Sequence, residues 1–349
     1  MLGMAGLGVV QIAQSGGWTA RGKRMTERHF AHRRHLLAAG LGLLAAPAVH
    51  AQERYPDRPI RFYIPWTAGS SSDMQMRSLC EEAAKILGQP IVIENRPGAS
   101  GTLHAQPLAM ARPDGYTLGQ MHLSVVRRPF MVKTPQWDAV ADFTHVMRVC
   151  GWLYGVAVKA DSPWKTWAEF TAHARANPGK VTFATSGIAT TNHLAMEDLG
   201  TRERVQFTHV PFRGSSEGVT AVLSGTVDCI ADSSAWMPHV EAGTMRCLCV
   251  WTENRVAKIG QVPTLKELGH DMVVTSPYGV SGPKGMDPGV VRTLHSAFKA
   301  ALESQANATV RAQYDMPVQY LSSADYTAFI TQRAAYERDM VTRLGIKLD

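Results

Sequence analysis

The sequence predicts an α/β protein built from two domains. The chain has 349 residues, about twice the length of a typical domain. Hydrophobic residues make up 45% of it and charged residues 19%, which is typical of a globular protein with a core and excludes a largely disordered chain. Strand-like and helix-like segments alternate along most of the sequence, which favours helices packed on mostly parallel sheets.

The first part of the chain contains short strands separated by helices. Strands are predicted at 60–64, 91–94 and 116–118. A helix is predicted over 73–87 because its apolar residues recur at helical spacing, with Ser72 as its N-cap and Gly88 ending it. A second helix is expected to end near residue 111, with Pro107 forcing a kink or a late start.

The same alternation continues from residue 152. Strands are predicted at 155–158, 181–184, 208–210, 227–231 and 247–251. Helices are predicted at 167–176, from 192, at 217–223, at 288–303 and at 323–344. We find no internal repeat of solenoid length, so the pattern indicates layered α/β domains.

Loops rich in Gly, Ser and Thr follow several predicted strands and open the next helix. They are Gly69 to Ser72, Ser186 to Thr191 and Gly214 to Ser216, with Pro97 to Gly101 as a related case. A helix N-terminus has unpaired N–H groups and partial positive charge, and small hydroxylated residues let a carboxylate approach it. Such loops gather at the carboxyl ends of strands, so together they predict an anion site. For any single loop, simple helix capping is the alternative.

The net charge of +7 comes mainly from the N-terminal segment. The first 51 residues carry six basic side chains and one acidic one, which leaves +2 for the remaining 298 residues. Arg33 and Arg34 precede an apolar stretch over 36–49 that ends at Val49-His50-Ala51, with small residues at the positions that signal peptidase inspects, as in an export signal cleaved before Gln52. Both a Sec and a twin-arginine signal fit this pattern. We therefore expect a periplasmic protein with no nucleic-acid partner.

The sequence predicts neither a metal site nor another cofactor. Its histidines lack paired metal-binding spacing, and neither a phosphate-binding loop nor a dinucleotide motif is found. The cysteines are Cys80, Cys150, Cys229, Cys247 and Cys249. Buried free thiols are favoured, and a bridge from Cys229 to Cys247 or Cys249 is left open.

One enzymatic alternative comes from Gly214 to Gly218, which matches the G-x-S-x-G pattern of a serine nucleophile, here Ser216. Asp228, Asp232, His270 and His295 follow in an order that a catalytic triad permits. Because so short a motif often occurs by chance, we favour a non-enzymatic protein over a secreted serine hydrolase.

Several motifs in combination resemble a known family of receptors. Tyr55 to Ile60 is similar to its usual start, and Pro65 to Asp73 is similar to its first loop, usually P-F-P-P-G-G-S-T-D. The other matching segments are Glu94 to Gly101, Pro113 to Leu118, Asn177 to Lys180, Ser186-Gly187 with His193-Leu194, Val210 to Gly214, Val262 to Leu265 and Gly282-Pro283. Residues 53–349 thus resemble the solute-binding receptors of tripartite tricarboxylate transporters, the Bug family.

The resemblance implies a type II periplasmic-binding-protein fold, in which two α/β lobes close on a ligand like a clamshell. Lobe 1 would comprise 52–151 plus 273–349 and lobe 2 would comprise 152–272, with two crossovers as the hinge. Residues 1–51 would be the N-terminal extension and signal peptide.

The resemblance also implies a set of ligand-binding residues. They are Trp66, Thr67, Ala68, Gly69, Ser70, Ser71, Ser72, Ser186, Gly187, Thr190, Thr191, Asn192, His193, Arg213, Gly214, Ser215, Asp232 and Tyr278. Trp66 and Ser70 depart from the family's first loop, and Trp66 and Tyr278 would either favour an aromatic ligand or pack at the hinge.

The implied function is capture of a small organic carboxylate, either a dicarboxylate or an aromatic acid, by a monomeric periplasmic receptor. The receptor would deliver this ligand to the membrane subunits of a tripartite tricarboxylate-type transporter. A protein of the same fold that acts as the partner of a membrane sensor is a further alternative.

Overall fold

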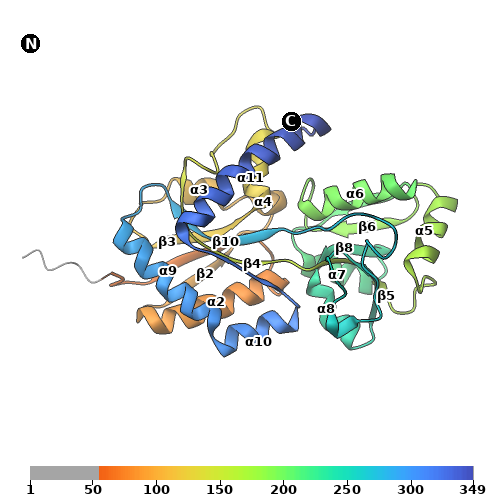
Figure 1. Cartoon of the computed structure of the whole chain (residues 1–349), viewed down its shortest axis with the longest axis horizontal. Helices are drawn as coiled ribbons and strands as arrows, with labels where there is room; N and C mark the ends of the chain where they lie inside the picture. Colours follow the sequence, from red (N-terminus) through yellow and green to blue (C-terminus); the bar gives the residue numbers. More distant parts are fainter. Residues whose placement is uncertain (1–54, 349) are drawn as a thin grey trace, which may run out of the picture. The chain divides into compact units, whose positions relative to one another are not determined.

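The computed structural model describes residues 55–348, and the predicted export signal lies outside them. These residues form two β-sheets, each covered by helices (Figure 1). In the part of the chain that is described, no helix is long and apolar enough to cross a membrane.

The first sheet has the strand order β11-β4-β10-β3-β1-β2. Its strands are β1 Ile60–Ile64, β2 Ile91–Asn95, β3 Thr117–His122, β4 Phe143–Gly151, β10 Pro277–Pro283 and β11 Val318–Leu321. Strand β1 pairs in parallel with β2 and β3, whereas β10 is antiparallel to β3 and β4. The sheet thus combines strands from both ends of the chain.

Helices cover both faces of this sheet (Figure 1). One face carries α2 Ser71–Leu87, α9 Pro288–Glu303 and α10 Gln305–Gln313. The other carries α3 Ala105–Ala109, α4 Leu123–Arg127 and α11 Ser323–Leu344. Buried residues such as Leu79 and Phe298 fill the first layer, and Val125 and Ile330 fill the second.

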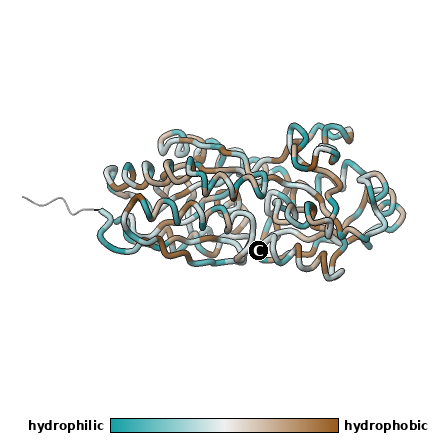
Figure 2. Tube along the Cα trace, turned by 90° about the horizontal axis from the view of Figure 1, so that it is seen from below, coloured by the Kyte–Doolittle hydropathy of each residue, from teal (hydrophilic) through white to brown (hydrophobic). Residues whose placement is uncertain are grey.

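The second sheet has the order β7-β6-β8-β5-β9. Its strands are β5 Tyr154–Lys159, β6 Thr182–Thr185, β7 Thr208–Pro211, β8 Cys229–Ser233 and β9 Met245–Val250. Its helices are α5 Trp167–Ala176, α6 Thr191–Glu203, α7 Ser215–Leu223 and α8 Met237–Glu241. Buried hydrophobic residues lie along the strands of both sheets, and hydrophilic stretches of the chain are found mainly in the outer loops (Figure 2).

The chain passes twice between the sheets. It leaves the first sheet after β4 and enters the second at β5, so residues 152–153 form one connection. It returns through residues 251–276 to β10. Short 3₁₀ turns, η1 Ala99–Gly101, η2 Arg128–Phe130, η3 Ser234–Trp236 and η4 Ala257–Ile259, complete the described elements.

Some sequence-based boundaries are corrected by the structure. The N-cap of α2 is Ser70 and not Ser72, because the Ser70 hydroxyl accepts the bond from the Asp73 N–H. Helix α3 starts late, which places Pro107 in the first turn, where a missing N–H costs little. Strand β3 runs four residues beyond the predicted end at Leu118.

All five cysteines are buried and free, as the sequence favoured. The bridge that was left open from Cys229 to Cys247 or Cys249 is not formed. Burial raises the pKa of each of these thiols, so they remain protonated and unreactive at neutral pH.

Candidate functional site

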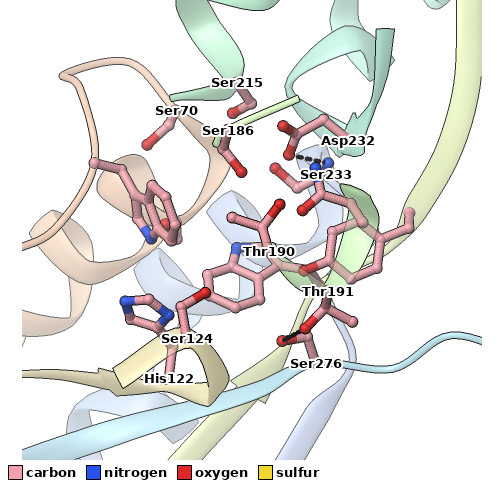
Figure 3. Close-up of a pocket in the computed structure, with 15 residues that line it drawn as sticks. Ser70, His122, Ser124, Ser186, Thr190, Thr191, Ser215, Asp232, Ser233 and Ser276 are labelled. Atoms are coloured by element: carbon pink, nitrogen blue, oxygen red, sulfur yellow. Dashed lines mark hydrogen bonds between the residues drawn. The ribbon is translucent and has the colours of Figure 1, made fainter. Parts of the chain in front are cut away.

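A small cavity lies between the two sheets and is lined by both of them (Figure 3). The residues that line it are Trp66, Ser70, Ser72, His122, Ser124, Trp152, Tyr154, Ser186, Thr190, Thr191, Asn192, Ser215, Asp232, Ser233 and Ser276. The volume open to the centre of a water molecule is about 20 Å³, which is enough for one or two waters. No Lys or Arg side chain of the described residues is part of this lining.

The N-termini of three helices contribute to the cavity wall. Ser70 and Ser72 come from the start of α2, Thr190 to Asn192 from the start of α6, and Ser215 from the start of α7. The hydroxyls of Ser72 and Ser215 make no hydrogen bond to another described residue, so they are available as donors. Three positive helix ends and free hydroxyls suit an anion.

Asp73 fixes the loop before α2. One of its carboxylate oxygens accepts the Gly69 N–H at 2.9 Å and the other accepts the Asn95 amide at 2.7 Å. The same Asn95 amide donates to the Trp66 carbonyl at 2.9 Å. Because Asp73 is buried and also bonded to Arg77, it holds the loop and does not line the cavity.

Aromatic rings form the side of the cavity nearest the connections between the sheets. The centre of the Trp66 ring lies 4.9 Å from that of His122 and 6.0 Å from that of Trp152. The ring centres of Trp152 and Tyr154 are 6.3 Å apart. The His122 Nε2 is 3.0 Å from the Gly101 carbonyl and therefore carries the ring proton. Burial, followed by repulsion from His104, lowers the pKa of His122 to about 3, so this ring adds no positive charge at neutral pH.

Asp232 is the one acidic side chain of the described cavity lining. Its Oδ1 accepts the Ser233 N–H at 2.6 Å, whereas its Oδ2 has no hydrogen-bond partner. Burial raises the pKa of Asp232 to about 6, and hydrogen bonding from Ser233, first of all its N–H, and from Ser186 opposes part of this rise. The carboxyl group therefore changes charge close to neutral pH.

Hydrogen bonds join the two sheets around the cavity. The hydroxyls of Thr67 and Ser216 are 2.7 Å apart, and Ser100 donates to the Ile188 carbonyl at 2.6 Å. Loops that follow strands of different sheets are thus in direct contact, and the cavity is closed between them.

The structure brings together part of the residue set that the sequence implied. Those that line the cavity are Trp66, Ser70, Ser72, Ser186, Thr190, Thr191, Asn192, Ser215 and Asp232. Those outside the lining are Thr67, Ala68, Gly69, Ser71, Gly187, His193, Arg213, Gly214 and Tyr278. Many of the second group form the loops and contacts that hold the first in place.

Four of them have a clear structural reason to lie elsewhere. The Arg213 side chain is 68% exposed and pairs with Glu217 one turn along the helix. Tyr278 is buried behind Trp152, with ring centres 4.6 Å apart, and donates to Gln75. The Thr67 hydroxyl is hydrogen-bonded to the Ser216 hydroxyl, and the His193 ring packs at a tilt against the His209 ring, with ring centres 3.9 Å apart.

Sequence reasoning missed His122, Ser124, Trp152, Tyr154, Ser233 and Ser276. His122 and Ser124 were missed because β3 was predicted to end too early, so its carboxyl end was not recognised. Ser233 follows Asp232 at the end of β8 and could have been found from that position. Trp152 and Ser276 lie in the connections between the sheets, where no local pattern indicates a site.

The geometry does not support the hydrolase alternative. Ser216 Oγ is bonded to Thr67 Oγ1 and to the Ala68 carbonyl at 3.2 Å, and among the described residues no histidine bonds it. His270 instead bonds Glu203, and His295 bonds Tyr320. The described residues also contain no cluster of three side chains suited to a metal ion.

The chain is similar to known receptor proteins. Residues 75–346 match the family described as tripartite tricarboxylate transporter family receptor. A UPF0065 protein from the gbd 5′ region of Cupriavidus necator is 44% identical over 324 residues, which cover 92% of this chain and 99% of that protein.

Solved structures of such receptors have the same fold. The periplasmic binding protein BugD is 25% identical with a TM-score of 0.79, covering 84% of this chain and 99% of that one. Rpa4515 from R. palustris, solved with adipate, is 27% identical with a TM-score of 0.78 over 84% and 99% of the two chains. MatC from Rhodopseudomonas palustris, solved with malate, is 26% identical with a TM-score of 0.76 over 82% and 100%.

These similarities confirm the fold and the resemblance seen in the sequence, and they agree with a binding site that has no catalytic serine. The chain belongs to the tripartite tricarboxylate transporter family of periplasmic solute-binding receptors, the Bug proteins.

Proposed function

We propose that the cavity between the two sheets binds a small organic carboxylate, either a dicarboxylate or an aromatic acid. The observation that carries this proposal is the meeting of the N-termini of α2, α6 and α7 at one cavity, where the hydroxyls of Ser72 and Ser215 are free. Recognition by N–H groups and hydroxyls needs no basic side chain, which fits the lining. The related receptors solved with adipate and malate support a carboxylate ligand.

We infer that the ligand holds two lobes together. Lobe 1 would comprise 52–151 and 273–349, and lobe 2 would comprise 152–272, with the two crossovers near residues 152–153 and 273–276 as the hinge. The cavity of about 20 Å³ is too small for a dicarboxylate to enter without movement of its walls. The lobes would therefore open to admit the ligand and close when it contacts both of them.

In this proposal the closed, ligand-loaded monomer delivers its ligand to the membrane subunits of a tripartite tricarboxylate-type transporter. The protein reaches the periplasm through a signal that is cleaved before Gln52. Intact-mass measurement of protein from the periplasmic fraction tests the cleavage site. Replacing Arg33 and Arg34 with lysine stops export by the twin-arginine route but leaves Sec export intact.

Thermal-shift measurement with dicarboxylates, aromatic acids and amino acids tests the ligand class. We expect at least one carboxylate to raise the melting temperature, because a ligand at a hundred times its Kd adds about 2.7 kcal/mol of stability. If none does so with folded protein, the proposed ligand class is wrong.

Two variants on one helix then locate the site. Ser215→Ala removes a lining hydroxyl at the start of α7 and should weaken binding, whereas Ser224→Ala at its end should not. Equal effects of both variants would place the ligand elsewhere.

A further inference from the structure

We infer that the preferred ligand carries, besides its carboxylate, a hydrogen-bond donor that Asp232 accepts. This inference rests on the proposed function and narrows it to hydroxy acids or amino acids. Simple dicarboxylates, which have no such donor when ionised, would be poorer ligands.

The first observation is the pair of polar atoms in the cavity wall that have no partner. Among the described residues, a few buried side-chain atoms lack a hydrogen bond, and two of them belong to lining residues: Trp66 Nε1 and Asp232 Oδ2. Both side chains are more than nine-tenths buried. A buried polar atom without a hydrogen-bond partner lowers stability by about 1 to 3 kcal/mol. Each of these two atoms therefore indicates a ligand group that would complete its hydrogen bond.

One of these atoms is a hydrogen-bond donor and the other is an acceptor. The indole N–H of Trp66 can only donate, so it suits a ligand carboxylate, as do the hydroxyls of Ser72 and Ser215. The Asp232 carboxylate accepts when it is ionised, so it suits a hydroxyl or an ammonium group. One molecule that satisfies both must carry an acceptor and a donor.

The charges in the cavity point the same way. The titratable side chains of the described lining are His122, Tyr154 and Asp232. His122 is neutral because burial lowers its pKa to about 3, and Tyr154 is neutral because burial raises its pKa. No lining cation therefore offsets the Asp232 charge, and a ligand that places a second carboxylate against Asp232, with no donor between them, would be repelled unless Asp232 took up a proton.

Matched trios of acids test this inference on the full mature protein by calorimetry. Each trio keeps the carbon skeleton and changes one group: succinate, malate and aspartate; glutarate, 2-hydroxyglutarate and glutamate; 3-phenylpropionate, phenyllactate and phenylalanine. In the trio whose skeleton fits, we expect at least one of the two acids with a donor to bind about tenfold or more tightly than the acid without one. Equal affinity, or tighter binding of the unsubstituted acid, overturns the inference but leaves the carboxylate site intact.

Proton exchange on binding separates the two kinds of donor. Near pH 6, an ammonium ligand should release protons because it favours ionised Asp232, whereas a hydroxy acid should release far fewer. Calorimetry in two buffers of different ionisation enthalpy measures this number. Proton uptake with every ligand would show Asp232 neutral in the complex and contradict the inference.

Asp232→Asn supplies the variant test, because it keeps the shape and removes the charge. It should weaken the preference within a trio, most of all for the ammonium member, because the amide oxygen still accepts but carries no charge, while the unsubstituted acid still binds. Asp228→Asn is the matched control, since Asp228 accepts from Thr182 outside the lining and should leave the preference unchanged. If Asp232→Asn does not fold, the affinities within each trio and the number of protons released by the unsubstituted protein still test the inference. If no acid of any trio binds, the proposed function itself fails.

Discussion

Arg127 and Glu337 form a buried ion pair whose guanidinium also reaches across to the second sheet. Arg127 Nε donates to Glu337 Oε2 at 2.6 Å, and the two side chains are 2% and 0% exposed. Arg127 Nη1 donates to the Ala189 carbonyl at 2.7 Å, in the loop that opens α6 beside the cavity. A charge pair between α4 and α11 thus positions a loop that belongs to the other sheet.

Replacing Arg127 with methionine should lower the free energy of unfolding by up to about 3 to 5 kcal/mol, because Glu337 would keep a buried charge with only the partly exposed Arg333 as its partner. Adding Glu337→Gln to this variant should recover part of the loss, since it removes that charge. Urea unfolding followed by circular dichroism measures both. Arg202→Met is the control, because the exposed pair of Arg202 with Asp198 should contribute less than about 1 kcal/mol. Equal losses for Arg127→Met and Arg202→Met would contradict this account.

Gly101→Ala should displace Trp66 in the cavity wall. The Gly101 φ is +78°, and an added Cβ would lie 2.6 Å from the Trp66 ring. Gly225 has a nearly equal φ of +76° with nothing near an added Cβ, so Gly225→Ala carries the backbone cost alone, about 1 to 2 kcal/mol. We expect Gly101→Ala to be less stable than Gly225→Ala and to bind its ligand more weakly, as measured by thermal unfolding and calorimetry. Similar stability and affinity would show that Trp66 can move freely.

Trp66→Phe should keep the aromatic packing and remove the indole N–H. If that N–H binds the ligand carboxylate, affinity should fall about threefold to tenfold, the usual contribution of one hydrogen bond. Trp164→Phe is the control, because Trp164 packs on Phe170 outside the cavity lining. Calorimetry with the acid found by the thermal-shift screen gives both values. An unchanged affinity for Trp66→Phe would assign Trp66 to packing alone.

The protein should lose stability as the pH falls from about 6.5 to about 4. Burial lowers the pKa of His104, His145 and His193 to about 4, and that of His122 and His209 to about 3. In this range the unfolded chain binds protons that the folded rings cannot take, so acid favours unfolding. Asp232 opposes the trend by one group, because its raised pKa lets the folded state take up a proton near pH 6, which the unfolded chain does only at lower pH.

His145→Asn tests this linkage away from the cavity, since His145 bonds Ser281 between β4 and β10. The slope of unfolding free energy against pH should become shallower by up to about 1.4 kcal/mol per pH unit between pH 4 and 6.5. Urea unfolding at several pH values measures the slope. Parallel curves for the variant and the unchanged protein would show that His145 does not contribute to the loss of stability in acid.

The sequence by itself determined the elements with strong local signals. Helices α5, α9 and α11 have the predicted ends, because capping residues such as Thr166 and Asp287 mark their starts. The glycine- and serine-rich loops were recognised because helix N-termini have a fixed local chemistry. The family was recognised from these same loops.

Only the tertiary structure decided which residues meet at the cavity. Strand β4 was not recognised, and strand β3 was predicted to end too early, so His122 and Ser124 had no assigned place. Arg213 and Tyr278 have suitable chemistry, but the Glu217 salt bridge and the Trp152 ring keep them out of the lining. The unpartnered oxygen of Asp232 depends on what packs around it from both sheets, and such long-range packing leaves no trace in a local sequence pattern.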